Sequence, residues 1–228
     1  RVVWVGYDDG SIWKAEDFPQ GWGEVGWGVS LPIEPVTDIE ISPHDPNTVM
    51  VTFGGYLANR VYRSVDSGQS WVNISGSGNG ALPPVQVNCV TYHPIDSSWI
   101  YAGTDIGLFA SEDGGETWNV TPRYAENEGP VYTEVSDLIW YADSNLVAVT
   151  YGRGMFTCRP VPVVFVNQAY NGPEDGSYLR PFNTVVEGFN SSGNGTKLVI
   201  YNGDYDEGSQ VMGKRLEVET RNGTVILR

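Results

Sequence analysis

Two eight-residue segments of almost the same pattern restrict the fold of this chain more than any other feature. The first is "SVDSGQSW" (64–71), and the second is "SEDGGETW" (111–118). Between them lies roughly one unit of 40 to 50 residues, the length of a repeat that folds as one supersecondary element. A catalytic group is needed once, whereas a structural device recurs with its unit. The repetition therefore favours a structural role for the acidic residues of both segments.

Strand-like segments surround these motifs in a constant order. The opening strands begin near Asp38, Asn88 and Asp137, which we align with one another. A second strand follows in each copy, and a third comes after a glycine-containing hairpin. The first copy begins only at its second strand, "VVWVGYDDGSIWKAED", and the last has no recognisable outer strand. Several strands per unit of this length are typical of β-propeller blades, so we expect an all-β fold with about four blade repeats.

Composition excludes several classes of function. The chain has 28 acidic and 13 basic residues, a formal net charge of −15, which argues against non-specific nucleic-acid binding. No apolar stretch is long enough for a membrane-spanning helix. With 28 glycines and 14 prolines the chain suits a turn-rich β protein, and its two cysteines, Cys89 and Cys158, are too few for a zinc site.

The two repeated segments resemble the Asp-box, Ser-x-Asp-x-Gly-x-Thr-Trp, of the sialidase-like (BNR), sortilin-like and xyloglucanase-like β-propellers. This resemblance implies that each segment forms the turn between the third and fourth strands of a blade, away from the active site of propeller enzymes. An aspartate in such a turn accepts backbone amide hydrogen bonds, a glycine adopts positive φ, and the tryptophan covers the hairpin. The structural residues are Ser64, Asp66, Gly68, Trp71, Ser111, Asp113, Gly115 and Trp118.

The outer copies of the motif are degenerate. The first copy, "AEDFPQGW", keeps only Asp17 and Trp22, and the last has Cys158 in place of the motif serine. Asp38 and Asp137 raise the alternative of a carboxylate pair for glycoside hydrolysis. Their recurrence in each copy favours a structural ring of polar groups instead, so we predict no catalytic residues.

Residues that break the repeat are better candidates for a ligand site. The hairpin tips between second and third strands differ in every copy, and by propeller topology they share a face with the starts of the inner strands. The candidates are Asp8, Tyr56, Asp105, Tyr151 and Arg153. Because tyrosine rings stack on sugars while aspartate and arginine form paired hydrogen bonds, we expect a glycan ligand. The alternative is a set of ordinary solvated hairpins.

A second module is expected from 161 to 228, after blade repeats at 1–160. Two prolines in "RPVPVVFV" mark the linker. The following segment resembles the N-terminal cap and first coil of right-handed parallel β-helix (pectate-lyase-like) domains, through 165–167, Asp175, Gly176, Pro181, Phe182 and "LVIYNGDYDE". Helical spacing from Phe182 to Phe189 predicts a short amphipathic helix, and three short strands are expected at 198–200, 216–218 and 225–227.

We expect no cofactor. Calcium is possible at the "EDG" of 174–176, but this segment alone supplies too few ligands for the ion. The sequence therefore identifies no set of metal-binding residues. The C-terminal module is interpreted as a structural or attachment unit, with carbohydrate binding as the alternative.

We expect an extracellular or cell-surface protein with a non-catalytic binding or scaffolding role. Because Arg1 opens directly into a strand-like run, we also expect further sequence upstream and place this segment at the C-terminal end of a larger secreted or surface protein. Upstream blades or other protein chains would complete the fold, and glycans are possible partners, without nucleic acid or membrane insertion. Two alternatives stay open: a glycoside hydrolase-like propeller acting on polysaccharide, and a C-terminal appendage of a secreted enzyme such as a peptidase.

Overall fold

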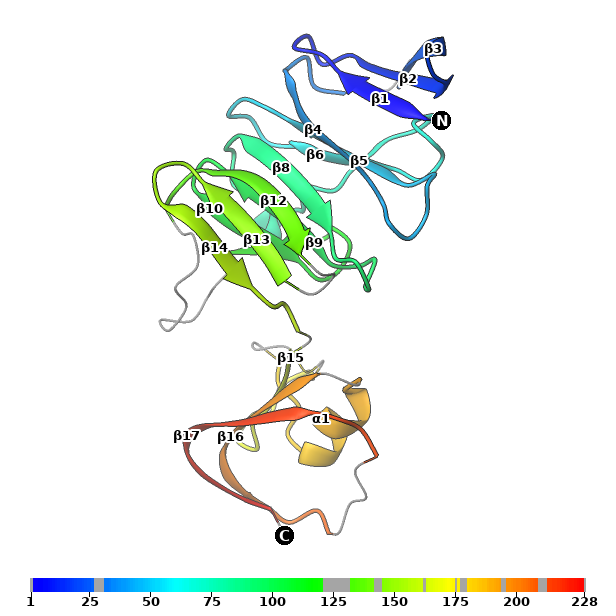
Figure 1. Ribbon diagram of the computed structural model, residues 1–228. Coiled ribbons are helices and arrows are strands. Elements are labelled where there is room, and N and C mark those ends of the chain that lie inside the picture. Colours follow the sequence, from blue (N-terminus) through cyan, green and yellow to red (C-terminus); the bar gives the residue numbers. More distant parts are fainter. Residues whose placement is uncertain are drawn as a thin grey trace. The chain divides into compact units, whose positions relative to one another are not determined.

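The computed structural model describes residues 2–26, 31–120, 132–141, 145–161, 163–174, 176, 180–193, 196–208 and 213–227. Strands dominate these residues, which confirms the predicted all-β fold (Figure 1). The chain divides into two compact units, Arg1–Arg159 and Pro160–Arg228. In the described part of the chain, no helix is both long and apolar enough to span a membrane.

The described residues of the first unit form four small antiparallel sheets, here numbered 1 to 4 along the chain (Figure 1). Sheet 1 consists of β1 (Val3–Gly6), β2 (Ile12–Asp17) and β3 (Gln20–Val25). Sheet 2 consists of β4 (Val36–Ile41), β5 (Val49–Phe53), β6 (Val61–Ser64) and β7 (Val72–Asn73). Sheet 3, after a 3-10 turn at Gly78–Gly80, has β8 (Val87–Tyr92), β9 (Ile100–Thr104), β10 (Gly107–Ser111) and β11 (Asn119–Val120). Sheet 4 consists of β12 (Val135–Tyr141), β13 (Asn145–Thr150) and β14 (Gly154–Cys158).

Strand order follows chain order in every one of these sheets, so each is an up-and-down meander. The three strands of sheet 1 correspond to the last three strands of sheet 2. The three strands of sheet 4 correspond to the first three strands of sheet 2. The first and last repeats are therefore incomplete, as the sequence predicted.

The first strands of sheets 2, 3 and 4 each contain a β-bulge, and these bulges change the alignment that was made from sequence. The register shifts between Val36 and Asp38 in β4, and the same shift follows Val87 in β8 and Val135 in β12. The bulged residues Thr37, Asn88 and Ser136 are therefore equivalent, and Asp38 and Asp137 match Cys89. Aligning Asn88 with the two aspartates was wrong by one residue, because a polar side chain at the bulge resembles the aspartate that follows the bulge in the other strands.

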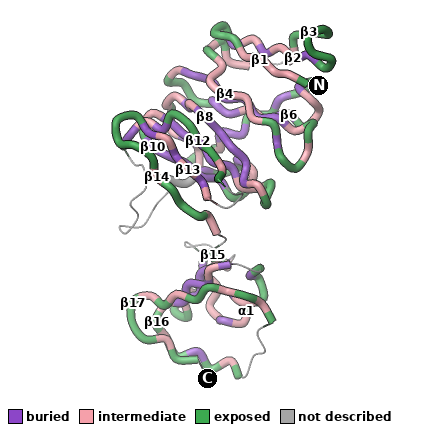
Figure 2. Tube along the Cα trace, viewed as in Figure 1, coloured by how far each residue is buried: buried purple, intermediate pink, exposed green. Residues whose placement is uncertain are grey.

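The sheets of the first unit pack through three apolar cores (Figure 2). Trp71 lies in the core shared by sheets 1 and 2, with Ile12 and Phe53. Trp118 lies in the next core, with Ile74 and Ile100. Full burial of one such side chain contributes roughly 1.5 to 3 kcal/mol. The tryptophans that close the two repeated motifs are thus part of the packing between successive sheets.

In the second unit the described residues form a parallel sheet and one short helix that packs on it. Its elements are β15 (Val163–Val166), α1 (Val185–Ser191), β16 (Lys197–Tyr205) and β17 (Glu217–Leu227), with sheet order β15-β16-β17. The helix overlaps the predicted span 182–189, but it begins at Val185 and ends two residues beyond that span, at Ser191. The expectation of separate strands at 216–218 and 225–227 was wrong, because β17 is one strand. Asn222 and Gly223 adopt positive φ inside it, where the register with β16 shifts, so they form an irregularity and not a chain reversal.

Candidate functional site

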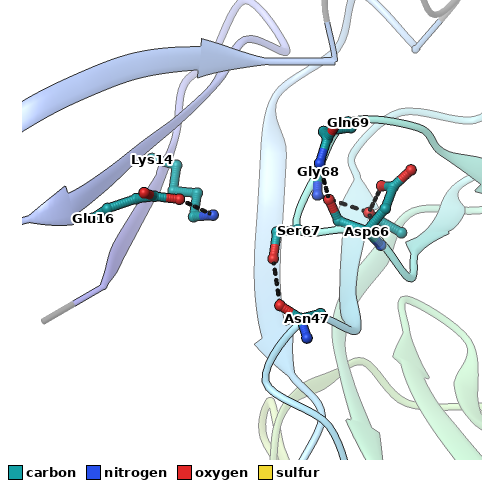
Figure 3. Close-up of polar contacts among 8 residues, drawn as sticks. Lys14, Glu16, Asn47, Asp66, Ser67, Gly68 and Gln69 are labelled. Atoms are coloured by element: carbon teal, nitrogen blue, oxygen red, sulfur yellow. Dashed lines mark hydrogen bonds and ion pairs between the residues drawn. The ribbon is translucent and has the colours of Figure 1, made fainter.

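The first repeated segment forms a tight turn after β6. The Ser64 hydroxyl donates to Asp66 Oδ1 at 2.7 Å and accepts the Gly68 amide at 2.7 Å. The Asp66 carboxylate accepts the Ser70 amide at 2.8 Å and the Ser70 hydroxyl at 2.5 Å. These hydrogen bonds, with those of Ser70 first, lower the pKa of Asp66 to about 2. The Asp66 carboxylate is therefore ionised and hydrogen-bonded within its own turn (Figure 3).

The second repeated segment makes the same set of contacts after β10. Ser111 donates to Asp113 at 2.8 Å and accepts the Gly115 amide at 2.8 Å, while Thr117 donates its amide and hydroxyl to Asp113. Gly68 and Gly115 have φ of 89° and 94°, a region that favours glycine. Each glycine also faces the preceding sheet so closely that a Cβ would lie within 3 Å of Trp4 or Ile74, respectively.

Each turn is bonded to the sheet before it. The Gly26 amide donates to the Gly68 carbonyl at 3.1 Å, and the Trp118 indole N–H donates to the Ile74 carbonyl at 2.8 Å. Arg63 in β6 donates to the Gly114 carbonyl at 3.1 Å. The acids of these turns thus hold a structure that links successive sheets.

At the opposite ends of the same strands, the hairpin tips lie beside the starts of the inner strands. The Asp105 amide donates to the Gln86 carbonyl at 3.3 Å, and the Tyr151 amide donates to the Glu134 carbonyl at 3.0 Å. The Tyr56 hydroxyl donates to Asp105 at 3.2 Å, although these residues belong to different sheets. Two of the five proposed ligand-binding residues, Tyr56 and Asp105, are therefore brought together.

The other three proposed ligand residues lie at separate tips. Asp8 is exposed in the β1–β2 hairpin, and Tyr151 and Arg153 are exposed in the β13–β14 hairpin. Tyr151 has 76% of its surface accessible, and Tyr56 has 68%. Both rings are therefore available for stacking on a ligand.

Two amide side chains at this edge were not among the ligand-binding residues predicted from sequence. Asn88 donates to Asp105 at 3.1 Å and to the Val135 carbonyl at 3.2 Å, so it connects sheets 3 and 4. Gln86 donates to Asn88 at 2.7 Å. Asn88 occupies the bulge position of its strand, where the equivalent Thr37 donates to the Val87 carbonyl at 2.5 Å, and this position is defined by strand register and not by a sequence signal.

The first strand of sheet 2, β4, contains two acidic side chains that accept hydrogen bonds across the boundary to sheet 3. Asp38 accepts the Ile39 amide at 2.8 Å and, across the sheet boundary, the Val90 amide at 2.9 Å. Burial raises the pKa of Asp38, with a smaller contribution from the charge of Asp137. Glu40 accepts the Thr91 hydroxyl at 3.1 Å, and burial raises its pKa to about 7.

The structure places only some of the possible metal ligands and both cysteines. Within them, no cluster of three or more His, Cys, Asp or Glu side chains is placed to hold a metal ion. The possible calcium ligand Asp175 lies outside the described residues. Cys89 is buried, Cys158 is exposed, and neither forms a disulfide.

Solved structures identify the fold of the first unit. A GH74 xyloglucanase from Xanthomonas campestris is 14% identical with a TM-score of 0.51, over 65% of this chain and 25% of that one. The GH74 enzyme of Niastella koreensis is 13% identical with a TM-score of 0.53, over 72% and 30%. The extracellular domain of a B. thetaiotaomicron protein described as a one-component system is 15% identical with a TM-score of 0.51, over 68% and 19%.

At these identities the likeness shows the fold alone, a part of a β-propeller, and the chain spans less than a third of each of these proteins. No protein-family model matches the chain, and no curated protein sequence does.

Proposed function

We propose that the chain is a non-catalytic binding and scaffolding part of an extracellular or cell-surface protein, with a glycan held at the edge formed by the hairpin tips. The supporting observation is that this edge combines exposed tyrosines with an acidic and amide network, Tyr56–Asp105–Asn88. Aromatic faces with neighbouring planar polar groups suit sugar rings and their hydroxyls. The extracellular sensor domain and the glycoside hydrolases with a similar fold are consistent with such a setting.

In this proposal the repeated turns are Asp-boxes and serve the fold. Their acids are held by hydroxyl and amide donors of the same turn. Other groups of the turns, such as the Trp118 indole, bond to the preceding sheet. The parallel three-stranded sheet of the second unit, with its single helix, is proposed as the beginning of a β-helix-like attachment module. Further blades or other protein chains would complete the sheets.

The glycoside hydrolase alternative is less favoured by the geometry of the inner strands. A catalytic acid pair needs carboxyl groups directed at a substrate. Both oxygens of Asp38 instead accept backbone amides, one of them in the neighbouring strand β8. Cys89 stands at the equivalent position of that strand. A polar group that supports the backbone in this way has a structural role.

A glycan array with the whole 228-residue chain tests the proposal. Tyr56→Phe keeps the ring and removes the hydrogen bond to Asp105, whereas Tyr56→Ala and Tyr151→Ala remove stacking surface. We expect the alanine variants and Arg153→Ala to lose binding, and Tyr56→Phe to keep most of it. Binding that survives all these changes but disappears with Asp66→Ala would place the ligand at the turns. Release of reducing sugar from a bound polysaccharide would favour the hydrolase.

A further inference from the structure

The bulge residues bond the first strand of one sheet to the first strand of the next. At the boundary between sheets 2 and 3, the Thr37 hydroxyl donates to the Val87 carbonyl at 2.5 Å. At the boundary between sheets 3 and 4, the Asn88 side-chain amide donates to the Val135 carbonyl at 3.2 Å. In both cases the acceptor is the residue just before the bulge of the following strand. The same contact therefore recurs at two successive boundaries.

The position after the bulge alternates between an aspartate and a neutral residue. It is Asp38 in β4, Cys89 in β8 and Asp137 in β12. Each aspartate accepts the amide of the next residue in its own strand with Oδ1, at 2.8 Å in both strands. Cys89 does not bind the amide that follows it, and this amide, of Val90, donates to Asp38 Oδ2 of the preceding sheet at 2.9 Å. One carboxylate thus serves two successive strands.

The same groups in sheet 4 are exposed. Ser136, at the bulge, and Asp137 both have high accessibility, whereas Thr37 and Asp38 are half-buried beside β8. Asp137 Oδ1 accepts the amide of its own strand, and within the described ranges of the chain Asp137 Oδ2 accepts no hydrogen bond. The acceptor that β4 uses to bind β8 is therefore available in β12.

These groups lie on an apolar face of sheet 4. Asp137 pairs with Val149, and Val149 pairs with Met155, so the three side chains share one face. Leu138 and Ala148 lie on the other face, in the core shared with sheet 3. The face with Asp137 thus points away from sheet 3, and on it Met155 is exposed. It continues the series of faces through which each sheet packs on the next.

Charge decides which kind of strand fits this face. An aspartate after the bulge of an incoming strand would bind the following amide itself, as Asp38 does in β4. Its carboxylate would also lie beside Asp137, and two carboxylates at one site repel each other. A neutral residue at that position leaves the following amide for Asp137 Oδ2, as Cys89 leaves its neighbour for Asp38. A strand of the β8 type is therefore favoured over one of the β4 type.

We propose that this face of sheet 4 binds the first strand of a further blade, in which an apolar residue, a bulge residue, a neutral residue and a second apolar residue follow one another. The second apolar residue donates its amide to Asp137 Oδ2. The Ser136 hydroxyl exchanges its contact with Glu134 for the carbonyl of the first apolar residue. Sheet 1 of a second copy does not fit, because its described strands correspond to the last three of a blade. This inference rests on the proposal that further blades or other chains complete the sheets.

The test is an NMR titration of the ¹⁵N-labelled whole chain with a peptide of the β8 sequence, 85–94, that contains Cys89→Ser. The amides of Asp137, Leu138 and Ile139 are expected to shift saturably. The matched peptide with Cys89→Asp is expected to bind about tenfold more weakly, because it loses one hydrogen bond to a charged group. Equal binding of the two peptides, or no saturable shift at these amides, would overturn the proposal.

Two substitutions in the chain provide the internal control. Asp137→Asn removes the charge but keeps an acceptor for its own strand, so it is expected to bind both peptides nearly equally. Asp38→Asn makes the same change where β8 already covers the site, and it is expected to keep the preference for the serine peptide. Spectra unchanged away from each substitution show that the variants are folded. A preference that persists in Asp137→Asn, or that disappears in Asp38→Asn, would contradict the proposal.

The result is independent of the other parts of the proposed function. Loss of glycan binding in the tip variants leaves the peptide titration unchanged, because the reporting amides lie in β12. A partner blade that co-purifies with the chain but has an aspartate after its bulge would support completion of the sheets and overturn this inference.

Discussion

The carboxylates of Asp66 and Asp113 show why a repeated acid and a unique acid need different interpretations. Each accepts the amide and hydroxyl of the residue four positions ahead and a serine hydroxyl two positions behind. Burial raises the pKa of Asp113, but the hydrogen bonds from Thr117 and Ser111 lower it by more, so the pKa lies below its usual value. Such a group stays ionised and bound within its turn, so it has little capacity to transfer protons to a ligand.

Glu40 differs, because its pKa is raised by burial to about 7, with smaller contributions from Asp38 and Asp137. The folded state therefore binds a proton more tightly than the unfolded state. The stability this group provides is fully present below about pH 4.5 and is lost as the pH rises through about 7. Asp38, whose pKa is also raised, contributes with the same sign.

We therefore predict that Glu40→Gln raises the free energy of unfolding at pH 8 by about 2 kcal/mol and changes it little at pH 4.5. Glutamine can still accept the Thr91 hydroxyl, so the hydrogen bond to β8 is kept. Urea unfolding of both proteins from pH 4.5 to 8 measures the effect. Glu24→Gln, at an exposed site in β3, is the control. A constant difference between Glu40→Gln and the original chain across this range would be evidence against the raised pKa.

At the scale of the elements, the turn tryptophan decides how well one sheet packs on the next. Trp118 has 4% of its surface accessible and donates to Ile74 in the preceding sheet. Trp118→Ala is expected to lower the free energy of unfolding by roughly 3 to 5 kcal/mol, the range for truncation of a buried large aromatic. Trp22, from the degenerate first copy, is 40% accessible, and Trp22→Ala is expected to cost about 0.5 kcal/mol. Equal losses in chemical unfolding would show that burial in the turn does not matter.

The helix of the second unit is stabilised at both ends by charges that lie outside it in sequence. Glu207 accepts the amides of Val185 and Val186 at 2.6 Å each, and Lys214 donates to the carbonyls of Phe189, Asn190 and Ser192. These contacts complement the helix dipole and satisfy groups without a partner in the helix.

Lys214→Met is expected to reduce local stability by about 1 kcal/mol, because three carbonyl groups at the helix end lose their cation. Hydrogen exchange of the α1 amides in the whole chain measures this change as faster exchange of the last turn. Asp206→Asn, at an exposed neighbour of Glu207, is expected to leave those rates unchanged. If both substitutions give the same rates, the cap has no energetic role.

Features that recur in every repeat could be predicted from the sequence. Features that depend on how neighbouring strands pair could not. The recurring Ser, Asp, Gly and Trp of the turns revealed both the repeat length and the strand order. The bulge at Thr37, Asn88 and Ser136 was not visible, because one extra residue leaves the polarity pattern almost unchanged. Asn222 and Gly223 resembled a turn, but pairing with β16 keeps them in a strand.

At the scale of the whole first unit, the outer sheets leave apolar surface uncovered. In sheet 4, Met155 is 71% accessible and Ile139 is 50% accessible. Its last strand, β14, pairs only with β13 among the described strands, so one edge keeps free backbone groups. Soluble proteins rarely leave such edges and faces open. We therefore expect a partner, either further blades or other chains, to cover them.

The central claim is that the first unit is an incomplete propeller. Size-exclusion chromatography with multi-angle light scattering of the 228-residue chain is its most direct test. A chain whose sheets need a partner is expected to elute as a defined oligomer or together with a partner protein, and to lose that state when Met155→Lys and Ile139→Lys are introduced. A monomer that stays soluble and free of aggregation across the concentration range would contradict the claim.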